Sequence, residues 1–386
     1  MVWAIVAAMC IATTLYGVVV PFLPLQAQTL GLDGVGIGAL FAIYGVASLV
    51  ATVGLGAWGH RANPRLMFVG SLLVLVASTV LFAFGEQTLW LLFIARSLQG
   101  AAAAAIWVMG PSMVAARYPP ATRGAAMGIV TGASAVGTLL GPPLGGVLYN
   151  LGGWGLPFVV VATGGLLLVW PCAWALSGVE RPKIADKDPE SIWALLSDPA
   201  VRRVCGVVAA AVAILALLEP LTPLWLDVRF QTDAMTNGLV LGAVVLAYAL
   251  FTTPAGAWSD RAGRFFVTAV GFAVMGLGLT LVSVAPSLVM TVVALAVVGT
   301  GLALALTPSN PAFADALDAR RGDGVIADST AYVRGFVLYS FVYGGGLLIG
   351  PALGGGLIDL IGLGPTLFCA GVFALLTAGL VRWGGA

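Results

Sequence analysis

Long apolar runs that recur along the whole chain constrain this sequence more than any other feature. Val204–Leu218 and Leu288–Leu306, for example, contain no charged residue. The 386 residues are 60% hydrophobic and only 9% charged, with a mean hydropathy of +1.05. Soluble domains are roughly 25% charged, and a soluble fold has too little interior to bury this much apolar surface. The chain is therefore predicted to lie in lipid, as helices of about 20 apolar residues, because the runs are continuous rather than alternating as in membrane β-barrels.

Breaks at polar, Gly and Pro residues divide the runs into twelve predicted spans. These spans cover 2–25, 36–58, 66–85, 88–114, 123–150, 154–176, 204–226, 235–258, 265–284, 286–313, 332–361 and 365–383. The run from Val2 to Leu25 is long for a signal peptide, so we interpret it as the first span. The predicted fold is an all-α membrane protein, with an N-terminal six-helix half (1–176), a cytoplasmic linker (177–203) and a C-terminal six-helix half (204–386).

Lysine and arginine are concentrated in alternate loops, and this asymmetry predicts the orientation. The basic loops hold Arg61, Arg65, Arg117, Arg123, Arg181, Lys183, Lys187, Arg202, Arg203, Arg261, Arg264, Arg320 and Arg321. The opposite set of loops holds only Arg229. Basic loops stay in the cytoplasm. We therefore expect a multi-pass protein of the cytoplasmic membrane with both termini inside.

Three segments recur in both halves in the same order. GAWGHRA at 56–62 returns as GAWSDRA at 256–262, PFLP at 21–24 returns as PLTP at 220–223, and GPPLGG at 141–146 returns as GPALGG at 350–355. The repeat predicts two pseudo-symmetric halves in parallel orientation. Transporters are commonly built this way, with the substrate site between the halves.

Several motifs resemble those of a known transporter family. The segment from Gly256 to Arg264 reads G-x-x-x-D-R-x-G-R, Arg96 to Gly100 reads R-x-x-Q-G, and Gly137 to Gly146 contains G-x-x-x-G-P-x-x-G-G. Together these motifs resemble the major facilitator superfamily and, within it, the drug/proton antiporters. The resemblance implies a secondary active transporter that works by alternating access.

Three longer segments are similar to the vesicular amine transporters and their bacterial relatives. They are VVVPFLP at 18–24, ARSLQG at 95–100 and LEPLTPLW at 218–225. Other positions depart from that branch: Ala12, Tyr44, Pro308 and Ser340 stand where its charged residues would fall. Only the helix 7 acid is kept, as Glu219. The resemblance therefore implies simpler coupling chemistry, centred on Glu219.

Glu219 is the one acid deep in an apolar run, about fifteen residues into the seventh predicted span. A charge in mid-membrane costs about 2.5–3.5 kcal/mol on insertion scales, so such acids are rarely without a role. We interpret Glu219 as a proton carrier, a counter-ion for a cationic substrate, or both; the alternative is a neutral acid that only packs. Pro220 and Pro223 follow it and are expected to open the helix there.

Arg96 is the one base deep in a span. A guanidinium at that depth needs acceptors. It is predicted to hold a buried hydrogen-bond network that responds to protons, or else to satisfy carbonyls at a helix end.

Two further motifs predict gating elements. Gly141–Pro142 and its second-half copy Gly350–Pro351 suggest a kinked, rocking contact, or plain packing of small residues. Asp260, with Arg261 and Arg264, suggests a lock in which the acid caps the next helix, or a solvated ion pair worth under about 1 kcal/mol. The first-half copy carries His60 and Asn63 instead, so that lock is degraded.

Aromatic and polar residues inside spans are candidates for lining a substrate cavity: Tyr44, Trp107, Asn310 and Tyr339. The alternative for membrane-edge aromatics is an interfacial anchor. Thr307 to Pro311 (TPSNP) is expected to break the tenth span and to face a cavity.

Composition excludes several other classes. Net charge is +1, so no nucleic-acid footprint is expected. The single His and four Cys lack metal or disulfide spacing, and no phosphate-binding loop occurs, so neither a metal, a cofactor nor an enzyme activity is predicted. The expected partners are a small-molecule substrate, protons and the lipid bilayer, and the expected state is a monomer.

Three functions remain open: proton-driven export of amphipathic or cationic small molecules, an efflux or facilitative carrier for neutral metabolites without proton coupling, and a non-transporting membrane protein, such as a sensor or chaperone, that retains the carrier fold. The third is disfavoured because Glu219, Arg96 and the Gly-Pro motif occur together.

Overall fold

A computed structural model describes residues 1–58, 63–118, 120–177, 192–319 and 329–383. In these residues the secondary structure is helical, with no strand. Eleven described helices are long and apolar enough to cross a membrane, by length and composition, and α6 (Pro120–Gly152) is a further long helix. The predicted all-α membrane fold is thus confirmed. His60, Arg61, Arg320, Arg321 and most of the predicted linker lie outside the described residues.

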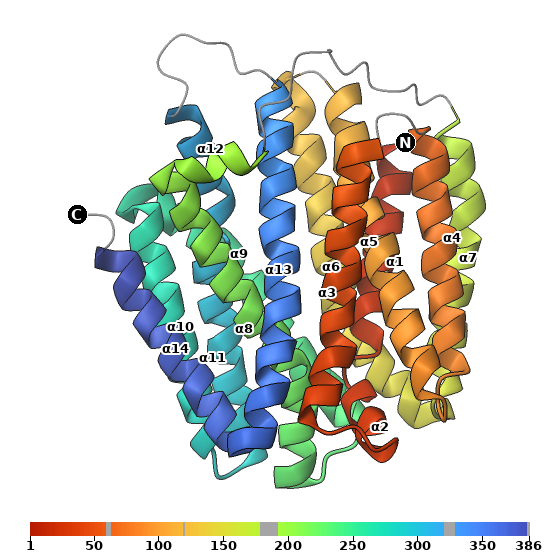
Figure 1. Ribbon diagram of the computed structural model, residues 1–386, viewed down its shortest axis with the longest axis vertical. Helices are drawn as coiled ribbons and strands as arrows, with labels where there is room; N and C mark the ends of the chain where they lie inside the picture. The colour runs from red at the N-terminus through yellow and green to blue at the C-terminus, as the bar shows by residue number, and fades with distance from the viewer. Residues whose placement is uncertain (59–62, 119, 178–191, 320–328, 384–386) are drawn as a thin grey trace. The chain divides into compact units, whose positions relative to one another are not determined.

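The chain divides into two compact units, each described by itself. Unit 1 comprises Met1–Lys187 and Thr232–Gly242, and unit 2 comprises Asp188–Gln231 and Ala243–Ala386. Unit 1 contains α1 (Val2–Val18), α2 (Leu23–Thr29), α3 (Gly34–Trp58), α4 (Pro64–Ala83), α5 (Leu89–Arg117), α6 and α7 (Gly155–Ala175), together with the start of α9 (Figure 1). Unit 2 contains η2 (Ile192–Ser197), α8 (Pro199–Phe230), the rest of α9 (Ala234–Ala262), α10 (Arg264–Val284), α11 (Leu288–Leu306), α12 (Ser309–Ala319), α13 (Ser329–Ile361) and α14 (Leu363–Trp383).

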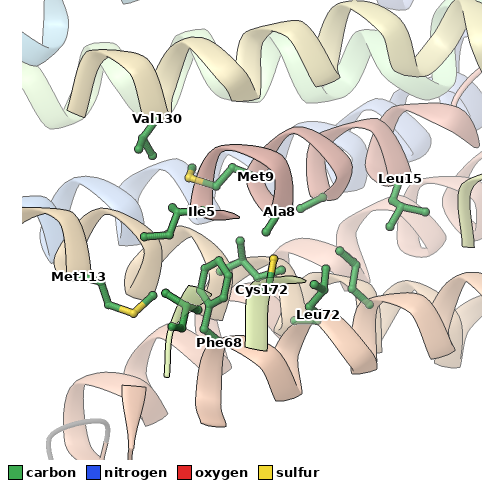
Figure 2. Packing of buried hydrophobic residues seen from close by; sticks show 14 of the residues in the cluster. Ile5, Ala8, Met9, Leu15, Phe68, Leu72, Met113, Val130 and Cys172 are labelled. Carbon is green, nitrogen blue, oxygen red and sulfur yellow. The ribbon is translucent and has the colours of Figure 1, made fainter. Parts of the chain in front are cut away.

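The core of unit 1 surrounds α1. Ile5 and Met9 of α1 are fully buried and pack with Phe68 of α4, Val130 of α6 and Cys172 of α7 (Figure 2). Helices α4, α6 and α7 therefore contribute apolar side chains to one cluster around α1, which fixes α1 inside its unit.

Glycines set how closely α6 approaches α1. A Cβ atom added at Gly137 would lie 2.1 Å from the carbonyl oxygen of Cys10, and one at Gly145 would lie 2.0 Å from that of Val18. A Cβ atom added at Gly141, which lies between them in the sequence, would be 2.9 Å from the Gly17 Cα. Only glycine fits at this spacing of four residues, so the predicted Gly-rich motif acts in small-residue packing within unit 1.

The second half repeats this packing. A Cβ atom at Gly350 would lie 2.1 Å from the carbonyl oxygen of Ala213, and one at Gly346 would lie 2.8 Å from the Val212 Cβ. These glycines belong to α13, which packs along α8 as α6 packs along α1. Pro351 lies within α13 and does not end it.

Two spans differ from their predicted form, and a third has the break that was predicted. The first span is two helices, because α1 ends at Val18 and α2 begins at Leu23. The prediction that Pro220 and Pro223 open the seventh span is wrong: α8 is one continuous helix through both. Successive prolines on a long buried helix remove hydrogen-bond donors, but packing holds the backbone helical. The expected break in the tenth span is confirmed, since α11 ends at Leu306 and α12 begins at Ser309.

Candidate substrate and coupling site

Arg96 of α5 is held in a box of aromatic rings inside unit 1. The side chain is fully buried. Its Cζ atom lies 4.7 Å from the ring centre of Phe41, 5.2 Å from that of Tyr16 and 5.8 Å from that of Tyr44. At these distances the ring faces attract a cation. Because Tyr16 belongs to α1 and the other two rings to α3, the box connects three helices.

Gln99 links the box to the end of α1. Arg96 donates a hydrogen bond from Nη1 to Gln99 Oε1 over 2.8 Å, and Gln99 donates from Nε2 to the Leu15 carbonyl over 2.9 Å. Leu15 lies in the last turn of α1, where carbonyls lack partners within the helix. Arg96 thus belongs to a buried hydrogen-bond network in which Gln99 bonds the helix-end carbonyl, and the response of this network to protons stays a prediction.

Tyr44, predicted to line a cavity, is part of this box. It is 8% exposed, and its ring centre lies 4.7 Å from that of Tyr16. The spacing of Arg96 and Gln99 on α5 is visible in the sequence, but the contributions of Tyr16 and Phe41 depend on packing between helices.

Glu219 lies in α8 of unit 2 and is half-buried. Its neighbours Leu218, Pro220 and Leu221 are buried. Because α8 begins at Pro199 rather than at 204, Glu219 is about 30 Å from the start of the helix and about 17 Å from its end at Phe230. Glu219 is thus deep in a span and only partly buried, and its role as a proton carrier stays a prediction.

Tyr339 of α13 and Ser309 of α12 form a hydroxyl pair in unit 2. Their oxygens are 3.1 Å apart, and Ser309 donates to the Leu306 carbonyl over 2.6 Å. Since Ser309 has a single hydroxyl proton, Tyr339 is the donor in the pair. Phe313 packs edge-on against Tyr339, with ring centres 5.9 Å apart. Asn310, next to Ser309, is exposed.

Trp107, the remaining predicted lining residue, is 41% exposed on α5. It takes no part in the Arg96 box, although both residues lie on the same helix.

Asp260 takes part in a charge cluster rather than capping a helix. Its Oδ1 is 3.0 Å from Arg264 Nη1, and Arg264 Nε is 2.5 Å from Asp315 Oδ2. The cap of α10 is Gly263, with no side-chain hydrogen bond, so the predicted capping role is wrong. Asp260 is still within the last turn of α9, too far back to reach the first amides of α10. Arg261 is exposed. Asp315 of α12 was not singled out from the sequence, because Asp315 is 51 residues from Arg264 in the sequence and approaches it only in the folded chain.

The start of α9 packs closely on α6 within unit 1. A Cβ atom at Gly238 would lie 2.4 Å from the Pro142 carbonyl oxygen, and one at Gly146 would lie 2.2 Å from that of Ala234. Asn150 donates from Nδ2 to Asp233 Oδ2 over 2.5 Å. Pro142 therefore lies in a tight contact between α6 and α9.

Asp233 also accepts a hydrogen bond from the Thr236 amide over 2.9 Å. Bonds from Thr236, and then from Asn150, hold the pKa of Asp233 below its ordinary value. In the other half, Asp33 caps α3 in the same way. Neither Asp233 nor its contact with Asn150 was singled out from the sequence, although the repeat places Asp33 and Asp233 at equivalent positions.

A comparison of the sequence with models of known protein families shows which family this chain belongs to. A family model described as Major Facilitator Superfamily matches residues 5–332 and 204–384. The chain belongs to this superfamily. The family predicted from the motifs is therefore confirmed.

Among curated proteins, this superfamily member is similar to transporters of vesicle membranes. It is 29% identical to the chromaffin granule amine transporter of Homo sapiens, over 89% of this chain and 64% of that protein. It is 27% identical to the synaptic vesicular amine transporter of Bos taurus, over 90% of this chain and 66% of that protein. It is 28% identical to the vesicular acetylcholine transporter of Drosophila melanogaster, over 84% of this chain and 56% of that protein. The chain thus spans less than two thirds of the length of these relatives.

Solved structures support the fold. The chain matches a bacterial homolog of the human lysosomal transporter Spinster, in an inward-facing and occupied conformation, with a TM-score of 0.81 at 16% identity over 99% of this chain and 95% of that chain. A point mutant of the nucleoside transporter NupG matches with a TM-score of 0.79 at 13% identity, over the whole of both chains. At this identity the likeness concerns the fold of the superfamily. Relatives and fold are those of transporters rather than enzymes, as predicted.

Proposed function

We propose that this superfamily member is a proton-coupled antiporter that exports amphipathic or cationic small molecules by alternating access. The observation that carries the proposal is Glu219, a half-buried carboxyl deep in the spanning helix α8. The curated relatives support it, because their names give amines and acetylcholine as cargo. Amines are cationic at neutral pH, and acetylcholine carries a permanent charge.

In this proposal the transport of substrate is coupled to that of protons because both bind the same carboxyl, that of Glu219. A proton and a cationic substrate compete for Glu219, because the neutral acid no longer attracts a cation. Apolar surroundings favour the neutral acid, so the proton exchanges readily. Protonation from the outside releases the substrate there, and loss of the proton inside restores the binding form.

Arg96 has a positioning role in this scheme. Its guanidinium is enclosed by Tyr16, Phe41 and Tyr44 and held by Gln99, so it fixes α1, α3 and α5 relative to one another. A rigid unit 1 can move as one body when the state of Glu219 changes.

Substrate contacts are proposed at Tyr339, Asn310, Trp107 and Tyr44. Aromatic faces bind ammonium groups, and the Tyr339–Ser309 pair offers hydroxyls for hydrogen bonds. The ring of Tyr44 is already engaged by Arg96, so Tyr44 contributes to a site through its edge or hydroxyl.

Gating is proposed at Asp260, Arg261 and Arg264 on one side. The ion pair of Asp260 with Arg264 ties α9 to α10, which supports this role. Gly141–Pro142 and Gly350–Pro351 are proposed as the surfaces along which helices shift. The proposal includes insertion in the cytoplasmic membrane with both termini inside, and a monomeric state.

The test is transport in proteoliposomes with an imposed pH gradient, using a cationic dye as probe. Glu219→Gln keeps the side-chain volume and mimics the protonated form, so pH-driven accumulation should be abolished. Binding of the cation should weaken by roughly 1.5–3 kcal/mol for one lost charge-assisted contact. The matched control is Asp227→Asn, a second acid of α8 near its end, which should transport as the wild type does.

A second candidate function is a carrier of neutral metabolites without proton coupling. Glu219→Gln protein that still concentrates its substrate at the wild-type rate would remove the proton role and support this alternative.

A further inference from the structure

An open groove runs along unit 1 between α3, α4 and α5. α3 and α4 each pack along α5, and the space between them holds about 500 Å³. Its walls are aliphatic and include Gly54, Leu55, Met67, Gly70, Val74 and Ala105. Ser71, the polar side chain in the lining, donates its hydroxyl proton to the Met67 carbonyl. The groove therefore offers a bound molecule apolar contacts and few hydrogen-bonding partners.

Small residues make this space. A Cβ atom added at Gly54 or at Gly70 would meet nothing within 4 Å. The floor on α5 is formed by alanines, including Ala102 and Ala105. The glycines of this groove thus differ from those facing α1, where an added Cβ would collide with backbone.

The second half of the chain fills the equivalent place with its own side chains. Two close contacts fix the register: Gly100 meets Tyr44, and Gly299 meets Val244 in the same way. The repeat of GAWGHRA as GAWSDRA sets an offset of 200 residues for α4, so Gly70 corresponds to Val270; Gly100 and Gly299 set an offset of 199 for α5, so Ala105 corresponds to Leu304.

Unit 2 has a hydrophobic cluster at these positions. Ala255, Val267 and Leu304 are buried in it, with Val270 and Val274 packed against them. All five correspond to residues that line the groove of unit 1. The same architecture is therefore closed in one half and open in the other.

The spacing of the helices differs for the same reason. Gly271 and Gly301 let α10 and α11 touch, since a Cβ atom at Gly271 would lie 2.4 Å from the Ala305 amide nitrogen. The corresponding residues in the first half are Ser71 and Ala102, whose side chains hold α4 away from α5.

We propose that this groove binds one acyl chain of an anionic phospholipid, with the phosphate at Arg65. Leu66 and Val74, at the rim, are 69% and 39% exposed, so the groove opens to the surroundings of a spanning helix. From Leu66 to Val74 the helix rises about 12 Å, close to the ~15 Å depth of one leaflet.

Charge favours an anionic headgroup. Arg65 precedes the rim in the first turn of α4, at the end of the groove nearest the membrane surface. Among the residues that the structure describes, no carboxylate pairs with Arg65. The Lys/Arg pattern predicts that this end faces the cytoplasm, so the lipid would come from the inner leaflet.

The test uses the full chain in phosphatidylcholine vesicles that contain phosphatidylglycerol with a photoreactive acyl chain. Labelled peptides are mapped by mass spectrometry. Residues 66–74 should be labelled well above the exposed face of α14. Gly70→Val, which copies Val270, should reduce this labelling about tenfold, or ~1.4 kcal/mol. Ala105→Leu should do the same, which guards against a folding defect in one variant.

Gly379→Val on α14 is the matched control, because an added Cβ there also meets nothing within 4 Å. It should leave the groove labelling unchanged. Arg65→Gln should remove the preference for phosphatidylglycerol over a phosphatidylcholine carrying the same photoreactive chain. Phosphatidylglycerol should raise the unfolding temperature of the wild type but not of Gly70→Val.

Groove labelling that is unchanged in Gly70→Val and Ala105→Leu would overturn the proposal. So would equal labelling by both lipids in the wild type, or cross-links from the groove to a second copy of the chain in place of lipid.

Discussion

Replacing Gln99 removes the link between the Arg96 box and α1. Gln99 is 1% exposed and makes two hydrogen bonds, one from the Arg96 guanidinium and one to the Leu15 carbonyl. A hydrogen bond to a charged group contributes about 1.5–3 kcal/mol and a neutral one about 0.5–1.5 kcal/mol. We therefore expect Gln99→Leu to lower the free energy of unfolding by about 2–4 kcal/mol.

Gln99→Glu separates the two bonds. The carboxylate still accepts from Arg96 and gains an ion pair, but it cannot donate to the Leu15 carbonyl. Its loss of stability should be about half that of Gln99→Leu. Ser97→Ala is the matched control on α5, because the Ser97 hydroxyl bonds only to the Phe93 carbonyl one turn back on the same helix.

The assay is thermal unfolding in detergent, followed by size-exclusion chromatography of the heated samples. For a unit of this size 1 kcal/mol shifts the unfolding temperature by roughly 2–4 °C, so Gln99→Leu should unfold about 4–16 °C below the wild type. The reasoning is refuted if Gln99→Leu costs no more than Ser97→Ala, or if Gln99→Glu costs as much as Gln99→Leu.

Three further predictions concern packing, pH and orientation. Gly145→Ala should force α6 from α1 and lower the unfolding temperature by several degrees, whereas Gly132→Ala, which meets nothing within 4 Å, should be neutral; equal effects would contradict the packing argument. The lowered pKa of Asp233 means that its contribution to stability is complete above its ordinary value of 3.8 and is lost as pH falls through the lower folded value. The wild type should therefore lose more stability than Asp233→Asn when the pH of an unfolding series falls below about 4. In a cysteine-free background, Asp33→Cys should react with an impermeant reagent from outside and Arg117→Cys only from inside; labelling of both from one side would contradict the predicted orientation.

Much of this protein could be predicted from short stretches of sequence. The membrane environment, the helix positions and the break after Leu306 follow from hydropathy and from Pro and Gly placement, which act locally along the chain. The superfamily follows from motifs such as Arg96 to Gly100. Local reasoning failed at Pro220 and Pro223, which were expected to interrupt α8, because the helix continues through both.

The candidate site was only partly predictable. Arg96 and Glu219 stand out, since isolated charges in apolar runs are costly and therefore conspicuous. The rings around Arg96 come from α1 and α3, and nothing in those segments marks Tyr16 or Phe41 as partners of a cation. Asp315 likewise joins Arg264 only because the broken span brings α12 beside α10.

The sequence by itself determined that the chain is a twofold-repeated bundle of apolar helices, because lipid permits few other ways to satisfy a backbone. Only the tertiary structure decided which small residues are contacts and which are empty space. Gly145 and Gly70 are both glycines on apolar helices, yet one touches the backbone of α1 and the other faces a groove. The physical reason is that a glycine makes a close contact or leaves a space according to the distance to the neighbouring helix. That distance is set by residues far away in the sequence.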